Sequence, residues 1–255
     1  MIRNSLNQLA VALLSLAGLG LCQQVALADV PMTLTGVNGA NLGGVYTSPY
    51  QFTVGPNSGV WLVCDDFLTD IGVGWFWDAN VYNLSNVKGH AKFQDLNATA
   101  PDGTVFTATV KEKYDAAAYL VEQLGMPTFP NPYVQSNSDA TLISYAIWQI
   151  FDPTAWRGYS SQLTPGQQST VKTYMTEAFD FDHQPTLPIP LSQVYIYTPN
   201  PASASQEFIG IGAPLNLHLE TATVSEGSTP TLLAFNFLAL PGIIFLLRRR
   251  ILRRA

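Results

Sequence analysis

Cys64 is the strongest candidate for a chemically reactive residue in this 255-residue sequence. The other cysteine, Cys22, lies in an N-terminal segment that we expect to be removed, so Cys64 would have no disulfide partner within the chain. A single cysteine in an exported protein is a buried inert thiol, an intermolecular bridge or a reactive group. Free cysteine is among the most buried residue types, which favours the inert thiol. Asp65 and Asp66 follow directly, and we expect them to face a turn, with a cation site as the alternative.

The sequence lacks the motifs of the common enzyme classes. It contains no G-x-S-x-G, no phosphate-binding loop, no H-E-x-x-H and no C-x-x-C. The three histidines, His90, His183 and His218, are isolated, which disfavours a hydrolase built on Cys64 and a histidine. The stretch 180–183 offers too few oxygens for calcium and too sparse a set of His and Cys ligands for zinc. We therefore predict a non-enzymatic protein with no cofactor and no metal.

Two short runs resemble the thioester domains of bacterial surface proteins: Trp61-Leu62-Val63-Cys64-Asp65-Asp66 and Ser144-Tyr145-Ala146-Ile147-Trp148. The resemblance implies a β fold with a helical insertion, in which a strand cysteine condenses with a helix glutamine in T-Q-x-A-[IV]-W. The resulting thioester reacts with amines on a partner surface.

Cys64 and Trp148 match the thioester pattern, but Ser144 stands where the glutamine is needed. Serine has no carboxamide and cannot acylate a thiol. Gln149 lies about 140° around the helix from Ser144, because each residue turns the helix by about 100°. We therefore expect a thioester-like fold without the bond, and an adhesin-like thioester module is the alternative.

Aromatic residues gather in stretches that are typical of loops. Trp75-Phe76-Trp77, with Trp156 and Tyr159, could form a platform on which sugar rings stack, because clustered exposed aromatics mark binding sites. Packing of the same rings into the core is the competing interpretation. A polysaccharide is therefore a candidate ligand.

The first 28 residues have the features of a secretory signal peptide. Arg3 precedes a nearly unbroken apolar run over 9–21, and Ala26 and Ala28 supply the small residues that a cleavage site requires. The run is shorter than the roughly 20 residues that span a bilayer. We therefore predict a signal peptide over 1–28, cleaved after Ala28, rather than an uncleaved anchor.

The C-terminus is apolar and then basic. Residues 231–247 carry no charge, and arginines follow, among them Arg248, Arg249 and Arg250. The apolar stretch is near the lower length limit for a membrane-spanning helix, and the arginines favour a cytoplasmic end. We predict that 231–255 is a single transmembrane helix with an arginine-rich tail.

A short motif precedes this segment, in which four residues match V-P-E-P-S-T: Val224, Glu226, Ser228 and Thr229. With the apolar segment and the arginines, they resemble the PEP-CTERM sorting tail, although both prolines are replaced. The resemblance implies an exosortase, a membrane transpeptidase of Gram-negative bacteria, as a partner. It implies an exported protein that is anchored in the inner membrane by its C-terminal helix and then reaches the cell surface or the extracellular matrix. Cleavage of the tail is left open.

The predicted ectodomain is strongly acidic. Outside the two ends, six lysine and arginine residues stand against eighteen aspartate and glutamate residues, a net charge of −12, whereas the whole chain carries −6. Such a surface disfavours nucleic acid and anionic lipid as partners. Solubility outside the cell is the simplest role of this charge.

The secondary-structure pattern runs from strands to helices and back to strands. We predict a β region over 29–110, a helical insertion over 111–184, returning strands of the same domain over 185–220 and a stalk over 221–230. Expected helices cover 111–124, 139–151 with Asn137 or Ser138 as cap, and 165–179 with Thr164 as cap. The order indicates a mainly β fold, a β-sandwich or open barrel, that carries a three-helix subdomain.

Overall fold

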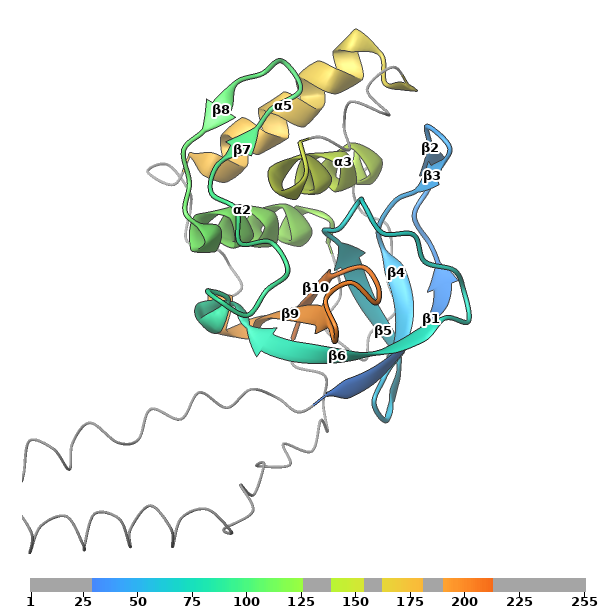
Figure 1. Ribbon diagram of the computed structural model, residues 1–255. Helices are drawn as coiled ribbons and strands as arrows, with labels where there is room; N and C mark the ends of the chain where they lie inside the picture. The colour runs from blue at the N-terminus through green and yellow to red at the C-terminus, as the bar shows by residue number, and fades with distance from the viewer. Residues whose placement is uncertain (1–28, 126–138, 154–161, 181–189, 213–255) are drawn as a thin grey trace, which may run out of the picture. The chain divides into compact units, whose positions relative to one another are not determined.

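Six antiparallel strands close into a barrel in the computed structural model, in the order β1-β4-β5-β10-β9-β6 (Figure 1). The structure describes residues 29–125, 139–153, 162–180 and 190–212. The barrel strands are β1 (Val30–Val37), β4 (Tyr50–Val54), β5 (Asn57–Cys64), β6 (Phe76–Asn83), β9 (Val194–Pro199) and β10 (Phe208–Ile211).

Alternation along the strands divides the core into two parts. Leu62 and Cys64 of β5 point into the barrel, where they join a buried cluster with Phe52 and Phe208. Val63, between them, joins the cluster formed with the helices. Successive strand residues face opposite sides of a sheet, so one short apolar run serves both cores.

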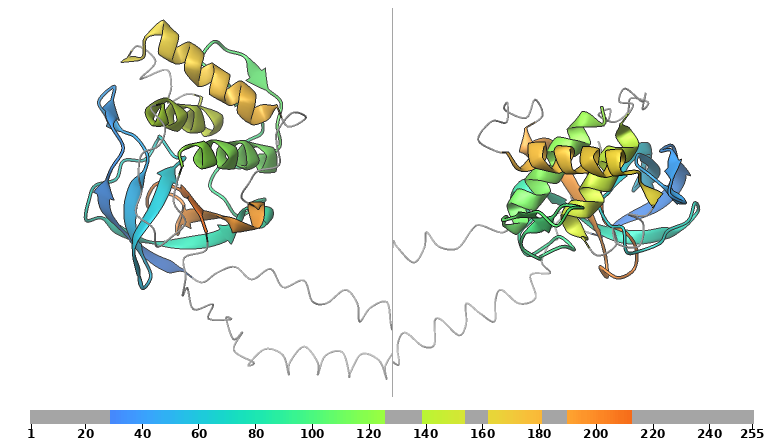
Figure 2. Two further views of the ribbon diagram at one scale, coloured as in Figure 1. Left: turned by 180° about the vertical axis from the view of Figure 1, so that it is seen from behind. Right: turned by 90° about the horizontal axis from the view of Figure 1, so that it is seen from above.

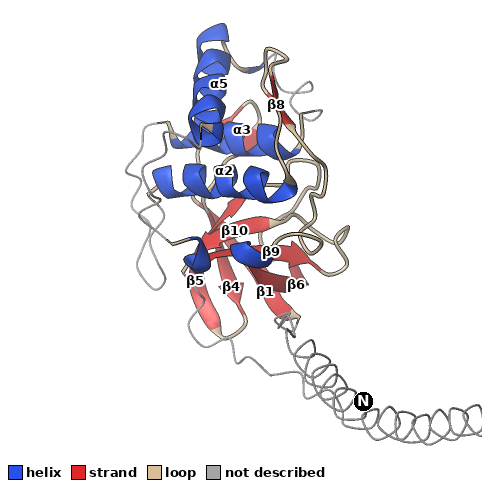
Figure 3. Cartoon of the chain, turned by 90° about the vertical axis from the view of Figure 1, so that its left-hand side faces the viewer, coloured by secondary structure: helices blue, strands red, loops and turns tan. Residues whose placement is uncertain are grey.

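Three helices form a layer on one side of the barrel: α2 (Val110–Gln123), α3 (Ala140–Phe151) and α5 (Pro165–Phe179). In two views α2 lies next to the barrel and α5 lies farthest from it (Figures 1 and 3). Seen from above, the helices cover part of the barrel (Figure 2). The side chains between the layers are apolar and buried, including Leu120, Ile147 and Ile209.

Side-chain caps define two of the helix starts. Thr109 and Glu112 form a capping box on α2, and Thr164 and Gln167 form one on α5, with proline in the first turn. The predicted cap of α5 is therefore confirmed. The cap of α3 is Asp139, which makes no side-chain capping bond, and the predicted caps Asn137 and Ser138 lie outside the described residues.

Smaller elements connect the main ones. Strands β2 (Asn41–Leu42) and β3 (Val45–Tyr46) pair as a hairpin, and β7 (Ala98–Thr99) pairs with β8 (Val105–Phe106). Two 3-10 turns, η1 (Leu84–Asn86) and η3 (Leu191–Gln193), flank the ends of β6 and β9.

The strand–helix–strand order and the three helices are confirmed, but the sandwich and the open barrel are wrong. The sheet closes because β1 pairs with β4 on one side and with β6 on the other. All described residues belong to one compact unit that ends at Leu217, and the second unit, 218–255, lies outside them. No helix within the described ranges has the length and apolar character needed to cross a membrane; the predicted segment 231–255 is not among them.

Candidate functional site

Cys64 ends β5 inside the barrel and is fully buried. Its thiol donates a hydrogen bond to the backbone oxygen of Asp66 at 3.0 Å. Burial raises the pKa of the thiol well above its usual value, and the nearby carboxylates of Asp66 and Asp65 raise it further. A neutral buried thiol is a poor nucleophile, because the thiolate is the reactive form.

Ser48 connects Cys64 to Ser144 of α3. The backbone N–H of Cys64 donates to the Ser48 hydroxyl oxygen at 3.1 Å. The backbone N–H of Ser48 in turn donates to the Ser144 hydroxyl oxygen at 3.1 Å. Ser144 completes its bonding by donating to the backbone oxygen of Ala140. Ser144 therefore acts here as a structural link between the helix and the barrel.

Trp148 lies one helical turn after Ser144 and is also buried. Its indole N–H lies against the sulfur of Cys64 and finds no oxygen acceptor among the described residues. Its ring packs against Phe67 and Tyr145, with centroids 5.0 and 5.1 Å away. The structure thus gathers Cys64, Ser144 and Trp148, which the sequence motifs had grouped.

Gln149 points elsewhere. Its side-chain amide donates to the backbone oxygen of Thr99 in β7, and the residue is 2% exposed. The carboxamide is thereby held against the β7–β8 hairpin. Its placement fits the wide angle that separates Gln149 from Ser144 around the helix.

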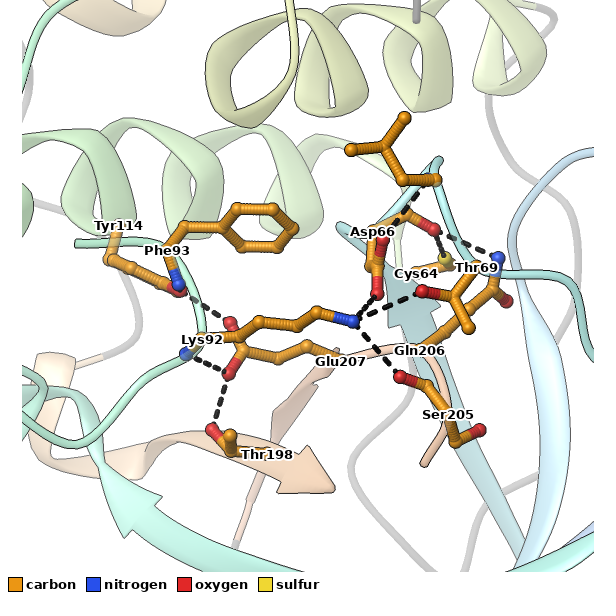
Figure 4. Close-up of polar contacts among 11 residues, drawn as sticks. Cys64, Asp66, Thr69, Lys92, Phe93, Tyr114, Thr198, Ser205, Gln206 and Glu207 are labelled. Atoms are coloured by element: carbon orange, nitrogen blue, oxygen red, sulfur yellow. Dashed lines mark hydrogen bonds and ion pairs between the residues drawn. The ribbon is translucent and has the colours of Figure 1, made fainter. Parts of the chain in front are cut away.

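Glu207, just before β10, is the centre of a buried polar cluster that sequence reasoning missed (Figure 4). Its carboxylate accepts hydrogen bonds from the hydroxyls of Tyr114 and Thr198. A third bond comes from the backbone N–H of Lys92 at 2.7 Å. We use the name buried polar cluster for Asp65, Asp66, Lys92, Tyr114, Thr198 and Glu207.

The ammonium of Lys92 extends the cluster toward the end of β5. It forms an ion pair with Asp66 and donates to the Thr69 hydroxyl and to the Ser205 backbone oxygen, both at 3.1 Å (Figure 4). Asp66 also accepts a bond from the backbone N–H of Leu68. The expected turn after Cys64 therefore exists, but Asp65 and Asp66 are fully buried rather than exposed on it.

Asp65 and Glu207 form a buried pair of carboxyl groups. Burial raises the pKa of Asp65 well above its usual value, and the neighbouring Glu207 raises it further. Burial also raises the pKa of Glu207, although the bonds from Thr198 and Tyr114 oppose that change. Because Glu207 accepts three bonds, Asp65 is the member that keeps the proton. With both groups at 0% exposure, the pair has no access to a substrate.

The structure describes three residues of the predicted aromatic platform. Trp75 and Phe76 are exposed, at 57% and 82%, but Trp77 is buried in the barrel against Phe52 and Phe208. A single platform of Trp75, Phe76 and Trp77 is therefore wrong. Phe76 and Trp77 are neighbours in β6 and face opposite sides of the sheet, and Trp75 precedes the strand.

Other candidate residues lie outside the described residues: Ala26, Ala28, Trp156, Tyr159, Asp182, His183, Val224, Glu226, Ser228, Thr229, Arg248, Arg249 and Arg250. Within the part that the structure describes, no group of three or more His, Cys, Asp or Glu side chains is placed to hold a metal ion.

Comparisons with known proteins give a structural likeness alone. No model of a known protein family matches the chain, and no curated protein matches its sequence. Among solved structures, it is similar to the N-terminal thioester domain of the fibronectin-binding protein SfbI from Streptococcus pyogenes, at 9% identity and a TM-score of 0.42 over 76% of this chain and 97% of that one. It is also similar to the N-terminal thioester domain of a surface protein from Clostridium perfringens, at 8% identity and a TM-score of 0.40 over 72% and 98%.

Proposed function

We propose that this chain is a non-enzymatic protein, exported to the cell surface or the extracellular matrix, whose Cys64 site is structural and forms no thioester. The environment of Cys64 carries the proposal. Its thiol bonds to the Asp66 backbone oxygen, and the Ser144 hydroxyl, at the position of the expected glutamine, bonds to Ser48. Condensation would need a carboxamide there, since the reaction joins sulfur to the side-chain carbonyl carbon and releases ammonia.

Export rests on the two ends of the sequence and on the charge between them. Three features fit a protein that acts outside the cytoplasm. They are an apolar run after Arg3, a second apolar run before the terminal arginines, and an ectodomain with a net charge of −12. The tail 224–255 would direct the protein to an exosortase. In this proposal the membrane anchor is an intermediate stage and the ectodomain is the functional part.

Intact-mass measurement of the purified chain tests the Cys64 part of the proposal. The expected mass is that of the processed sequence, unchanged by methylamine, and one thiol reacts with iodoacetamide after unfolding. A mass lower by one ammonia, with methylamine incorporated at Gln149, would show a thioester. Cys64→Ala is the matched control, because it removes the sulfur and keeps a small side chain in the barrel.

The proposed export route is tested by expressing the protein in a Gram-negative host that has an exosortase. The comparison is the same host without the exosortase. We expect the mature protein to begin at Asp29 and to lose its tail only when the exosortase is present. Replacing Arg248, Arg249 and Arg250 by alanine should leave the tail uncleaved, whereas replacing the ectodomain residues Lys88, Lys111 and Lys172 should not. A chain that stays in the cytosol with both ends intact contradicts the proposal.

A further inference from the structure

We propose that a groove beside the barrel binds a saccharide that carries no acidic group. The groove has a volume of about 300 Å³ and lies between the β2–β3 hairpin and the loop 70–73. Side chains that bear on its chemistry are Tyr46, Tyr50, Phe67, Asp70, Trp148 and Gln206. Its volume is near the lower end of the range for small-molecule sites, about 300 to 1,000 Å³, and suits one end or one short stretch of a glycan.

The first wall of the groove is held in place from two sides. Tyr145 of α3 donates to the backbone oxygen of Leu42 at 2.8 Å, and Tyr50 donates to the backbone oxygen of Tyr46 at 2.6 Å. Gly43 allows this approach, because its φ is +68° and a Cβ there would lie 2.9 Å from the Tyr145 hydroxyl. The hairpin is therefore fixed before any ligand arrives.

The second wall is tied to β1. Gly74 donates to the backbone oxygen of Leu34 at 2.8 Å, and Leu34 donates to that of Trp75 at 3.0 Å. The Trp75 ring lies over Gly72, which lines the groove; a Cβ at Gly72 would meet the indole nitrogen at 3.1 Å. Tyr46 on one wall and Trp75 at the rim of the other are both more than half exposed, so each offers an aromatic surface to a ligand.

The unused polar atoms of the groove are acceptors. Asp70 lines it with an exposed side chain, and none of the described residues bonds to its carboxylate. Gln206 donates through its amide nitrogen to the Asp66 backbone oxygen at 2.8 Å, while its buried side-chain oxygen has no partner in the described part of the chain. The exposed carboxylate of Asp70 only accepts hydrogen bonds, so a ligand that donates them is favoured here.

A neutral sugar satisfies these conditions together. Its hydroxyls donate to Asp70, and the C–H face of its ring stacks on Tyr46 or Trp75. An acidic glycan is disfavoured because Asp70 and the net charge of −12 would repel it. An alkylammonium also donates to Asp70, so hexylammonium is the comparison that separates attraction to a positive charge from recognition of a sugar.

This inference goes beyond the proposed function and uses neither Cys64 nor the route of export. The two can therefore fail separately: a thioester found by mass leaves the groove chemistry standing, and a groove that binds no sugar leaves the route and the inert thiol standing.

Titration of the purified full chain tests the groove, in a detergent without a sugar headgroup. The probes are cellohexaose, isomaltohexaose and N-acetylchitohexaose, with hexagalacturonate and hexylammonium as comparisons, read by calorimetry and by tryptophan fluorescence. We expect at least one neutral probe to bind at millimolar concentration or below, and hexagalacturonate to fail.

Variants locate the binding on the groove. Tyr46→Ala and Asp70→Asn should each weaken it about tenfold, the effect of one lost stacking contact or hydrogen bond. Phe76→Ala and Asp78→Asn are the matched controls, since both side chains are exposed and neither lines the groove. Thermal melting checks that each variant folds. Binding to hexylammonium alone, binding to no neutral probe, or equal weakening by the control variants would overturn the proposal.

Discussion

Tyr114 of α2 donates a hydrogen bond from its phenol to the carboxylate of Glu207, and both residues are fully buried. The bond joins the helical layer to the start of β10, across 93 residues of sequence. Tyr114 also accepts a bond from the backbone N–H of Phe93 at 3.3 Å. One hydroxyl therefore connects the helix, the barrel and the loop that carries Lys92.

Tyr114→Phe should destabilise the fold without changing its shape. The substitution removes a hydrogen bond to a charged group, and we expect a loss of about 1.5 to 3 kcal/mol in the free energy of unfolding. Tyr119→Phe on the same helix is the control, because Tyr119 is only half-buried. Chemical denaturation measures both variants, and an equal loss in the two would mean that the Glu207 contact contributes nothing of its own.

Asp65→Asn should alter how stability depends on pH. The pKa of Asp65 is raised in the folded state, so the folded protein retains a proton that the unfolded chain releases near pH 4. Its stabilising contribution is complete below that pH and is lost as pH rises through the folded-state pKa. Asparagine keeps the shape and a donor toward Glu207 at every pH.

Melting temperatures between about pH 4 and about pH 8 measure this effect. The Asp65→Asn variant should gain stability relative to the native chain as pH rises, and the exposed control Asp78→Asn should follow the native curve. A variant that loses stability equally across the range would show that Asp65 is not the group that holds the proton.

Ser144→Ala should cost about 1 to 3 kcal/mol, because the buried backbone N–H of Ser48 would lose its acceptor. Thr173→Ala is a suitable comparison, since Thr173 is exposed on α5 and its hydroxyl bonds only within its own helix. Equilibrium unfolding of both variants gives the difference. Equal stabilities would mean that water replaces the serine hydroxyl, and that the link between Ser48 and α3 is dispensable.

Tyr145→Phe should loosen the β2–β3 hairpin. The substitution removes the bond to the Leu42 backbone oxygen and leaves the ring in place. We expect about tenfold faster hydrogen exchange at the Thr47 amide, which bonds across the hairpin base to Ala40. Tyr174→Phe on α5 should leave that exchange rate unchanged, and an equal rate in the Tyr145 variant would show that other contacts hold the hairpin.

Local patterns in the sequence predicted the elements well, because their causes are local. Thr164 and Pro165 mark the start of α5 through capping chemistry. The spacing of Ser144 and Trp148 places both on one face of α3, and their approach to Cys64 followed from the resemblance to thioester motifs.

Features that depend on distant pairing were not predictable in the same way. Barrel closure requires β1 to meet both β4 and β6, which no short window of sequence records. Lys92 and Glu207 are adjacent only because β10 pairs with β5 and the loop after η1 folds over both. Phe76 and Trp77 also take opposite roles through strand register, although the period-two alternation within β6 contained that signal.

Closure of the barrel also affects how copies of this protein behave when they are crowded. Each barrel strand already has a neighbour on both sides, so none offers a free edge on which a second molecule could add a strand. Densely packed copies would therefore resist fibril growth through the barrel. Such growth would first require β1 to separate from β4 or from β6.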